Sequence, residues 1–141
     1  MTEPITLKPC NIREVWDTIK PGLEAIKAEW PQLNAWRIED IYAAVIAEQA
    51  VLYAVEEGFA ICTLKTDEYS GETDLCIWIA YAYENNRGGM LKKYLPSFIE
   101  AAKSFGCSGV TTVSNHPALA HMKELEPMFT QYRVKVDETT K

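Results

Sequence analysis

The stretch from Thr73 to Phe105 constrains the fold more than any other part of the chain. Residues 73–83 are apolar almost throughout and rich in aromatic and β-branched side chains, which is typical of a strand covered on both faces. Residues 84–89 form a turn with two glycines, and residues 90–105 repeat apolar side chains at helical spacing. We therefore expect a strand, a turn and a helix that packs on the sheet and ends at Gly106. The apolar stripe of this helix consists of Leu91, Tyr94, Leu95, Phe98, Ala102 and Phe105.

This succession of strand, glycine turn and helix can hold an anion. The N–H groups of a first helical turn point beyond the helix, and the helix dipole favours negative charge there. Arg87 adds a positive charge beside Gly88 and Gly89. The alternative is that the glycines serve only the geometry of the turn. Both interpretations stay open at this point.

Composition excludes several classes of protein. A chain of 141 residues with 48% apolar and 24% charged residues is expected to form one domain, 1–141, with a buried core. The net charge of −6 argues against a simple electrostatic nucleic-acid binder. No apolar run reaches the roughly 18–20 residues of a membrane span, and the N-terminus lacks a signal-peptide pattern. We therefore expect a cytoplasmic protein with neither nucleic acid nor membrane as partner.

The four cysteines are scattered, without a C-x-x-C pair, and are expected to be free thiols in a reducing cytosol. His116 and His121 are not paired with cysteines at ligand spacing, so the sequence predicts no metal site.

The remaining segments alternate between period-two and helical patterns. Pro21 and Gly22 interrupt the first helical pattern, so we expect two separate pieces there. The order of elements is β-α-α-β-β-β-α-β-α-β, which predicts a mixed sheet with helices on both faces. The further predicted strands are 5–8, 50–55, 59–66, 109–113 and 129–136. The further helices are the first one, in the two pieces 12–20 and 23–30, and then 36–47 and 117–125.

This order, with a glycine turn after the fourth strand, resembles the GCN5-related N-acetyltransferase (GNAT) superfamily over nearly the whole chain. The signature of that superfamily is Q/R-x-x-G-x-G/A, whose backbone N–H groups cradle the pyrophosphate of coenzyme A. The matching window is 86–91, in which Gly89 agrees, whereas Asn86 replaces Gln or Arg and Leu91 replaces Gly or Ala. The resemblance implies an α+β (α/β mixed) fold with a mostly antiparallel central sheet flanked by helices.

Four shorter segments, 36–41, 50–53, 64–69 and 105–107, also look like small acetyltransferase-like proteins of bacteriophages. Some of those resemble a phage protein needed to assemble the internal parts of the virion. Two functions stay open. One is an N-acetyltransferase that transfers an acetyl group from acetyl-CoA to an amine of a small molecule or protein. The other is a non-catalytic GNAT-fold phage protein that acts in virion assembly or partner binding. The possible protein partners are a second copy of this chain or a virion protein.

The resemblance also assigns candidate cofactor-binding residues. The pantetheine arm of coenzyme A would lie along the fourth strand, bonded to its backbone at Ile79 and Tyr81. Asn115, at the end of the fifth strand, matches a position where the family often places an asparagine against the cofactor, although a helix cap explains it equally well. The pyrophosphate would lie at Asn86, Arg87, Gly88, Gly89, Met90 and Leu91.

Catalysis of acetyl transfer requires a base for the amine and donors for the developing oxyanion. Some family members carry a glutamate early on the fourth strand as this base, and Asp74 or the preceding Glu72 falls near that place. The alternative for Asp74 is a solvated strand end. Many members also have a tyrosine in the last helix that protonates the leaving thiolate, whereas this chain has His121 and Met122 there. Any acetyl transfer by this chain is therefore predicted to be slow, without a well-positioned base and proton donor.

Overall fold

The computed structural model describes residues 7–29, 31, 35–83, 87–112, 125–126, 128, 132, 134 and 136, and only the backbone of Arg87 and Gly88. Its elements follow the predicted order in this part of the chain. The predicted helix 117–125 and the predicted last strand 129–136 lie outside the described residues except for isolated positions. The elements are α1 (Ile12–Glu29), α2 (Ile38–Ile46), β1 (Val51–Val55), β2 (Gly58–Thr66), β3 (Thr73–Ala82), α3 (Arg87–Ser104) and β4 (Gly109–Thr112).

The four described strands form one sheet in the order β1-β2-β3-β4. β1, β2 and β3 pair antiparallel, and β4 pairs parallel to β3. The predicted mixed and mostly antiparallel sheet is therefore confirmed. The chain before α1 runs beside β1, where Pro9 forms an isolated antiparallel bridge with Tyr53 and the Cys10 N–H donates to the Leu52 carbonyl (2.8 Å). Of the predicted first strand, 5–8, residues 5 and 6 lie outside the described part.

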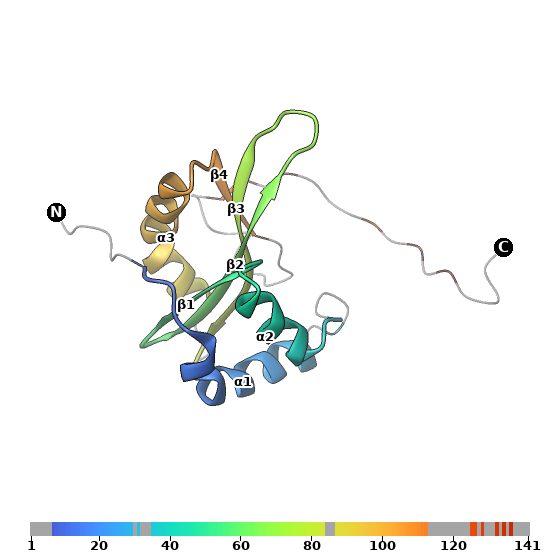
Figure 1. Ribbon diagram of the computed structural model, residues 1–141, viewed down its shortest axis with the longest axis vertical. Helices are drawn as coiled ribbons and strands as arrows, with labels where there is room; N and C mark the ends of the chain where they lie inside the picture. Colours follow the sequence, from blue (N-terminus) through green and yellow to red (C-terminus); the bar gives the residue numbers. More distant parts are fainter. Residues whose placement is uncertain are drawn as a thin grey trace.

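Helices cover both faces of the sheet, with α3 on one face and α1 and α2 on the other (Figure 1). Each face has its own cluster of buried side chains. The α3 face includes Leu75 and Ile77, whereas the α1–α2 face includes Ile61 and Ile79. β3 therefore contributes to both clusters, as its almost continuous apolar sequence predicted.

The predicted break at Pro21 and Gly22 is wrong, because α1 is one helix from Ile12 to Glu29. A proline inside a helix is unfavourable by roughly 3 kcal/mol, so tertiary packing must compensate. Gly22 explains the packing, because a Cβ atom there would lie 2.7 Å from Tyr81 Cδ1 and 2.8 Å from Phe59 Cε1. The absent side chain lets α1 approach β3 closely, and Leu23 beside it is fully buried.

α3 also differs from its predicted bounds at both ends. It begins at Arg87 instead of Met90, so Gly88 and Gly89 belong to its first turn and not to a preceding turn. It ends at Ser104, and Gly106 closes it with a positive φ of 74°, as expected for a helix C-cap. Phe105 therefore falls outside the helix and is 44% exposed, which corrects its predicted place on the buried stripe.

α2 begins at Ile38 instead of Trp36, because Arg37 is its N-cap and its N–H donates to Asp40 Oδ2 (3.0 Å).

Among the described residues, no helix combines the length and the apolar character required to cross a membrane.

Candidate functional site

A β-bulge interrupts the pairing of β2 with β3 halfway along the two strands. Ile61 pairs with Ile79, whereas the next residue of β2, Cys62, pairs with Ile77, so Trp78 is the extra residue of β3. A bulge bends its strand and re-aims the neighbouring side chains, and bulges are over-represented next to active sites. Here Trp78 and Ile79 both pack toward the cluster under α1 and α2.

The described pairing of β3 with β4 ends at the same place. Thr112, the last residue of β4, pairs with Ile77, and its hydroxyl donates to the Ile77 carbonyl oxygen (3.1 Å). Beyond this point β3 stays paired with β2 from Ile79 to Ala82, whereas the described part of β4 does not reach it. The N–H and C=O groups of a strand point alternately to its two edges. In this half of β3 the alternation places the N–H and C=O groups of Ala80 and Ala82 on the β4 side, because the Tyr83 N–H donates to the Glu57 carbonyl on the β2 side.

The first turn of α3 follows this half of β3, after three residues outside the described part. It contains no acidic residue, so nothing in its sequence opposes the attraction of the helix N-terminus for anions. Met90 and Leu91 are buried in the cluster under α3, with 8% and 6% exposure. The bulk of Leu91, which departs from the GNAT signature, therefore lies in the core, and only its backbone is available to a ligand.

The turn between β1 and β2 packs against both of these elements. Gly58 pairs with Ala82, and a Cβ atom at Gly58 would overlap the Tyr81 carbonyl oxygen and lie 2.8 Å from the Met90 sulfur. Only a residue without a side chain permits this approach. Gly58 thus brings the turn against the end of β3 and the first turn of α3 at once.

Ile79 and Tyr81, the residues predicted to line the pantetheine arm, both lie beyond the end of the described β4 ladder. The Ile79 side chain is buried, and the Tyr81 ring lies 5.8 Å from the Phe59 ring and 6.0 Å from the Tyr83 ring. Both side chains therefore belong to the packing under α1. Their backbone groups face β2, because the Tyr83 N–H donates to the Glu57 carbonyl and every second residue of β3 points the same way. A ligand on the β4 side would therefore meet the backbone of Ala80 and Ala82 and not that of the two predicted residues.

The structure brings part of the predicted cofactor set together. Gly89, Met90 and Leu91 lie in the first turns of α3, next to the end of β3. Arg87 and Gly88 begin the same helix, with only their backbone described. Asn86 and Asn115 lie outside the described residues, so their predicted roles stay predictions.

The predicted bases lie at the other end of β3. Asp74 pairs with Lys65 on β2 and with Gly109 on β4. At about 3.3 Å per residue, an extended strand places Asp74 roughly 17 Å from Ile79. Asp74 therefore lies in the half of β3 before the bulge, and its role as a base stays a prediction.

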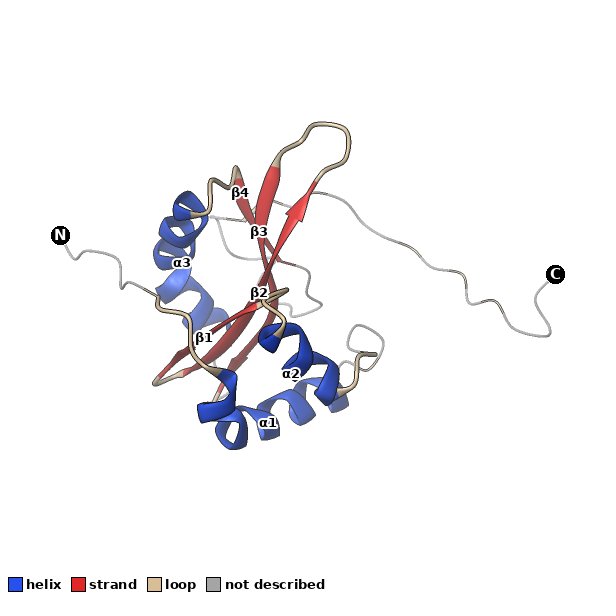
Figure 2. Cartoon of the chain, viewed as in Figure 1, coloured by secondary structure: helices blue, strands red, loops and turns tan. Residues whose placement is uncertain are grey.

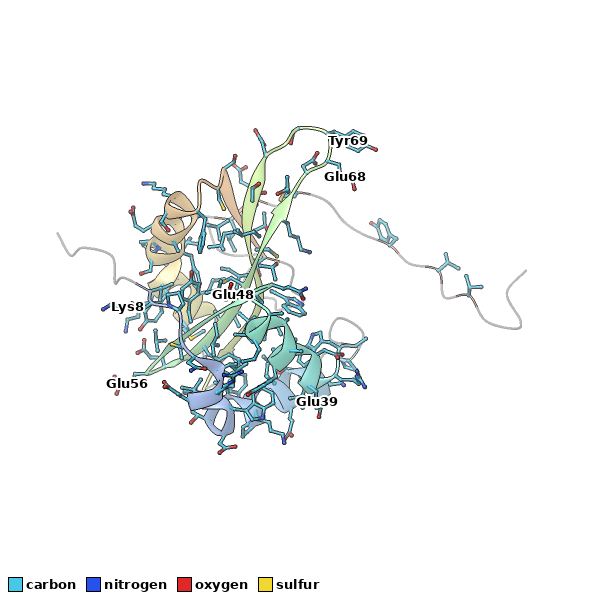
Figure 3. All side chains as sticks on the ribbon, viewed as in Figure 1. Lys8, Glu39, Glu48, Glu56, Glu68 and Tyr69 are labelled. Carbon is cyan, nitrogen blue, oxygen red and sulfur yellow. The ribbon has the colours of Figure 1, made fainter. Side chains whose placement is uncertain are left out.

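Glu72 lies still farther away, in the β2–β3 loop. Figure 2 shows this loop extending beyond the helical layers, and Figure 3 shows Glu68 and Tyr69 at its tip. Glu72 takes part in the internal bonding of the loop, since its carbonyl accepts from the Asp67 N–H (2.8 Å) and its N–H donates to Ser70 Oγ (3.2 Å). The structure therefore separates both predicted bases from the predicted cofactor residues.

Three features of the site were missed from the sequence: the bulge at Trp78, the close approach at Gly58, and the contacts of Glu57 with α3. The only sequence signal for them is Gly58, the glycine directly after the β1–β2 turn.

No family model matches the sequence, and no curated protein is significantly similar to it. Solved structures do match. The ribosomal-protein-alanine N-acetyltransferase of Brucella melitensis biovar Abortus 2308 is 12% identical, covers 93% of this chain and 98% of its own, and has a TM-score of 0.64. An aminoglycoside acetyltransferase from an uncultured soil sample is 13% identical, with coverage of 93% and 97% and a TM-score of 0.63.

An acetyltransferase of Trypanosoma brucei is similar as well, at 15% identity, with coverage of 93% and 97% and a TM-score of 0.58. The chain has an acetyltransferase fold. The α+β class implied by the GNAT resemblance is thereby confirmed across almost the whole length of these structures. None of the three proteins is described as a phage protein, so the resemblance to phage proteins stays a prediction.

Proposed function

We propose that the chain is a GNAT-type N-acetyltransferase that binds acetyl-CoA at the junction of β3 and α3 and transfers the acetyl group to an amine. The observation that carries this proposal is the junction itself. A strand with a bulge at Trp78 leads toward a helix whose first turn has no acidic residue. The fold supports the proposal as well, because solved acetyltransferases have a similar structure over almost their whole length.

The residues at the junction fit coenzyme A by their chemistry. The pantetheine arm carries amide groups, which match the β4-side edge of β3 at Ala80 and Ala82, next to the predicted Ile79 and Tyr81. The pyrophosphate is an anion, which matches the N-terminus of α3 from Arg87 to Leu91. Asn86 and Asn115 complete the proposed binding set. Bound acetyl-CoA would supply an acetyl group activated as a thioester.

The acceptor is proposed to be an amine of a small molecule or of a protein. The similar structures include an enzyme named for ribosomal protein alanine and one named for aminoglycosides. The net charge of −6 favours a cationic acceptor over an anionic one.

The contribution of this chain to the chemistry is proposed to be mainly positioning. Orientation of an amine that is already neutral lowers the barrier without any proton transfer by the protein. A dedicated base contributes about 10²–10⁴-fold, and the chain offers for that role only Asp74 and Glu72, with no tyrosine at the position predicted for the leaving thiolate. The same observation favours a second candidate function, a non-catalytic protein that uses the fold to bind a partner.

Asp74→Asn should lower the rate of acetyl transfer by less than about tenfold, because orientation of an amine that is already neutral needs no base from the protein. The rate should rise with pH toward the pKa of the acceptor amine and then level off, without a bell-shaped profile. Steady-state rates against pH, for the parent and the variant with one soluble amine, measure both effects.

Glu72→Gln is the matched control, since it removes a loop carboxylate that is farther still from the junction. A loss of several hundred-fold in Asp74→Asn alone, in a folded protein, would show a dedicated base. Binding of acetyl-CoA without transfer to any amine would favour the non-catalytic candidate.

A further inference from the structure

The two-residue turn between β1 and β2 consists of Glu56 and Glu57, which have the same chemistry but different surroundings. The Glu57 main-chain carbonyl accepts a hydrogen bond from the Tyr83 N–H (2.9 Å), directly after β3. Its carboxylate oxygen Oε2 accepts from Lys93 Nζ (2.8 Å) and from the Tyr94 hydroxyl (2.7 Å), in the second turn of α3. Glu57 therefore holds the segment before the β3–α3 connection and the segment after it.

The protonation states of these groups make the arrangement stable at neutral pH. The hydrogen bonds from Lys93 and Tyr94 keep the pKa of the Glu57 carboxyl below its usual value. The same carboxylate raises the pKa of Lys93, and burial together with the bond to Glu57 raises the pKa of Tyr94. Glu57 is therefore an anion with two donors that both keep their protons.

Stability alone does not account for this arrangement. The Lys93 and Glu57 side chains are 55% and 39% exposed, and ion pairs with this much exposure contribute little to the free energy of unfolding. The bonds instead fix the position of the β1–β2 turn relative to α3. Gly58, the next residue, packs against Met90 and the Tyr81 carbonyl at the same place. The contacts of Glu57 with Lys93 and Tyr94, together with the packing of Gly58, thus attach the β1–β2 turn to both β3 and α3.

We propose that Glu57 is a positioning residue, which sets the spacing between the end of β3 and the N-terminus of α3 and thereby shapes the site for the phosphates of coenzyme A. This inference rests on the proposed function for its ligand. It adds to that function a residue outside the GNAT signature, from a different hairpin. Glu57 acts through α3 and the end of β3 and need not touch the ligand.

The test compares Glu57→Ala with Glu56→Ala, which removes the neighbouring carboxylate from the same turn. Glu56 is exposed, and Figure 3 shows it directed outward from the sheet. Calorimetry with coenzyme A should show about tenfold weaker binding for Glu57→Ala, because the second turn of α3 loses both bonds that hold it to the β1–β2 turn, and unchanged binding for Glu56→Ala. Glu57→Gln should recover part of the affinity, because its amide oxygen can still accept from Tyr94.

A double-mutant cycle separates positioning from a general loss of stability. Tyr94→Phe removes one donor to Glu57, so Glu57→Ala should weaken binding less in the Tyr94→Phe background than in the parent. A purely structural role would instead lower the melting temperature and leave the affinity of the folded protein unchanged. Equal affinities of folded Glu57→Ala and Glu56→Ala would overturn the proposal.

Amide hydrogen exchange gives a second measurement that does not depend on a ligand. The amides of the second turn of α3 should exchange faster in Glu57→Ala than in Glu56→Ala. The Tyr83 amide should change little, because its acceptor is the main-chain carbonyl of residue 57, which both variants keep. If the parent does not bind coenzyme A, the proposed function fails, and exchange alone decides whether Glu57 holds the junction. Equal exchange in the two variants would then overturn the positioning role as well.

Discussion

Replacing Gly89 by aspartate should abolish coenzyme A binding while leaving the protein folded. Gly89 is exposed in the first turn of α3, where the phosphates are proposed to bind. A carboxylate about 4 Å from a phosphate charge is repelled by roughly 4 kcal/mol at an effective dielectric constant near 20, which is about a thousandfold in affinity. Calorimetry at micromolar protein concentration should therefore detect no binding.

The fold should tolerate this change, because an acidic residue in the first turn of a helix interacts favourably with the helix dipole. Gly89→Asn is the matched control, with nearly the same shape and no charge, and should retain most of the affinity. Binding by Gly89→Asp as tight as that of the parent would place the ligand elsewhere on the molecule.

Among glycine-to-alanine substitutions at described positions, Gly58→Ala should lower the free energy of unfolding the most. The new methyl group would overlap the Tyr81 carbonyl oxygen, and the Met90 sulfur lies 2.8 Å from the same position. Because the overlap is with backbone, a side-chain rotation cannot relieve it. Overpacking of this kind typically lowers the free energy of unfolding by about 1–3 kcal/mol, and we expect the upper end of that range in urea titrations.

Gly109→Ala provides the control on the other side of β3. Both glycines pair with β3, but a Cβ atom at Gly109 would meet only the end of the Asp74 side chain, at 3.2 Å. That side chain can move, so this variant should lose little stability. Equal losses in the two variants would show that the contact at Gly58 is not as tight as the structure has it.

The strands could be predicted from the sequence because their signals are local. The apolar runs predicted β1 and β2, and the long apolar run predicted β3 within one residue of its observed end. Its burial on both faces followed from the lack of alternation. The fold class followed from the order of these elements.

The helices show where local signals fail. Pro21 and Gly22 are breakers by propensity, yet α1 continues through them because Gly22 fits against Tyr81 and Phe59. Gly88 and Gly89 were assigned to a turn, although glycine also tolerates helical backbone angles in a first turn. In both cases tertiary packing or position in the helix outweighed propensity, and neither is visible in a single sequence.

The candidate site was predictable in outline only. The order of strand, turn and helix located the junction, and the superfamily resemblance supplied its candidate residues. The bulge at Trp78 depends on the register between β2 and β3, which local patterns do not determine. The contacts of Glu57 join residues 36 and 37 positions apart, so no spacing in the sequence could reveal them.

The most direct test of the proposed acetyl-CoA site is an amide chemical-shift titration of the isotopically labelled chain with acetyl-CoA. The proposal predicts that the largest shifts fall on the second half of β3, from Trp78 to Ala82, and on the first turn of α3, from Arg87 to Met90. The amides of the β2–β3 loop around Tyr69 serve as the internal reference and should stay in place. No shifts at saturating ligand, or shifts confined to other parts of the chain, would contradict the account.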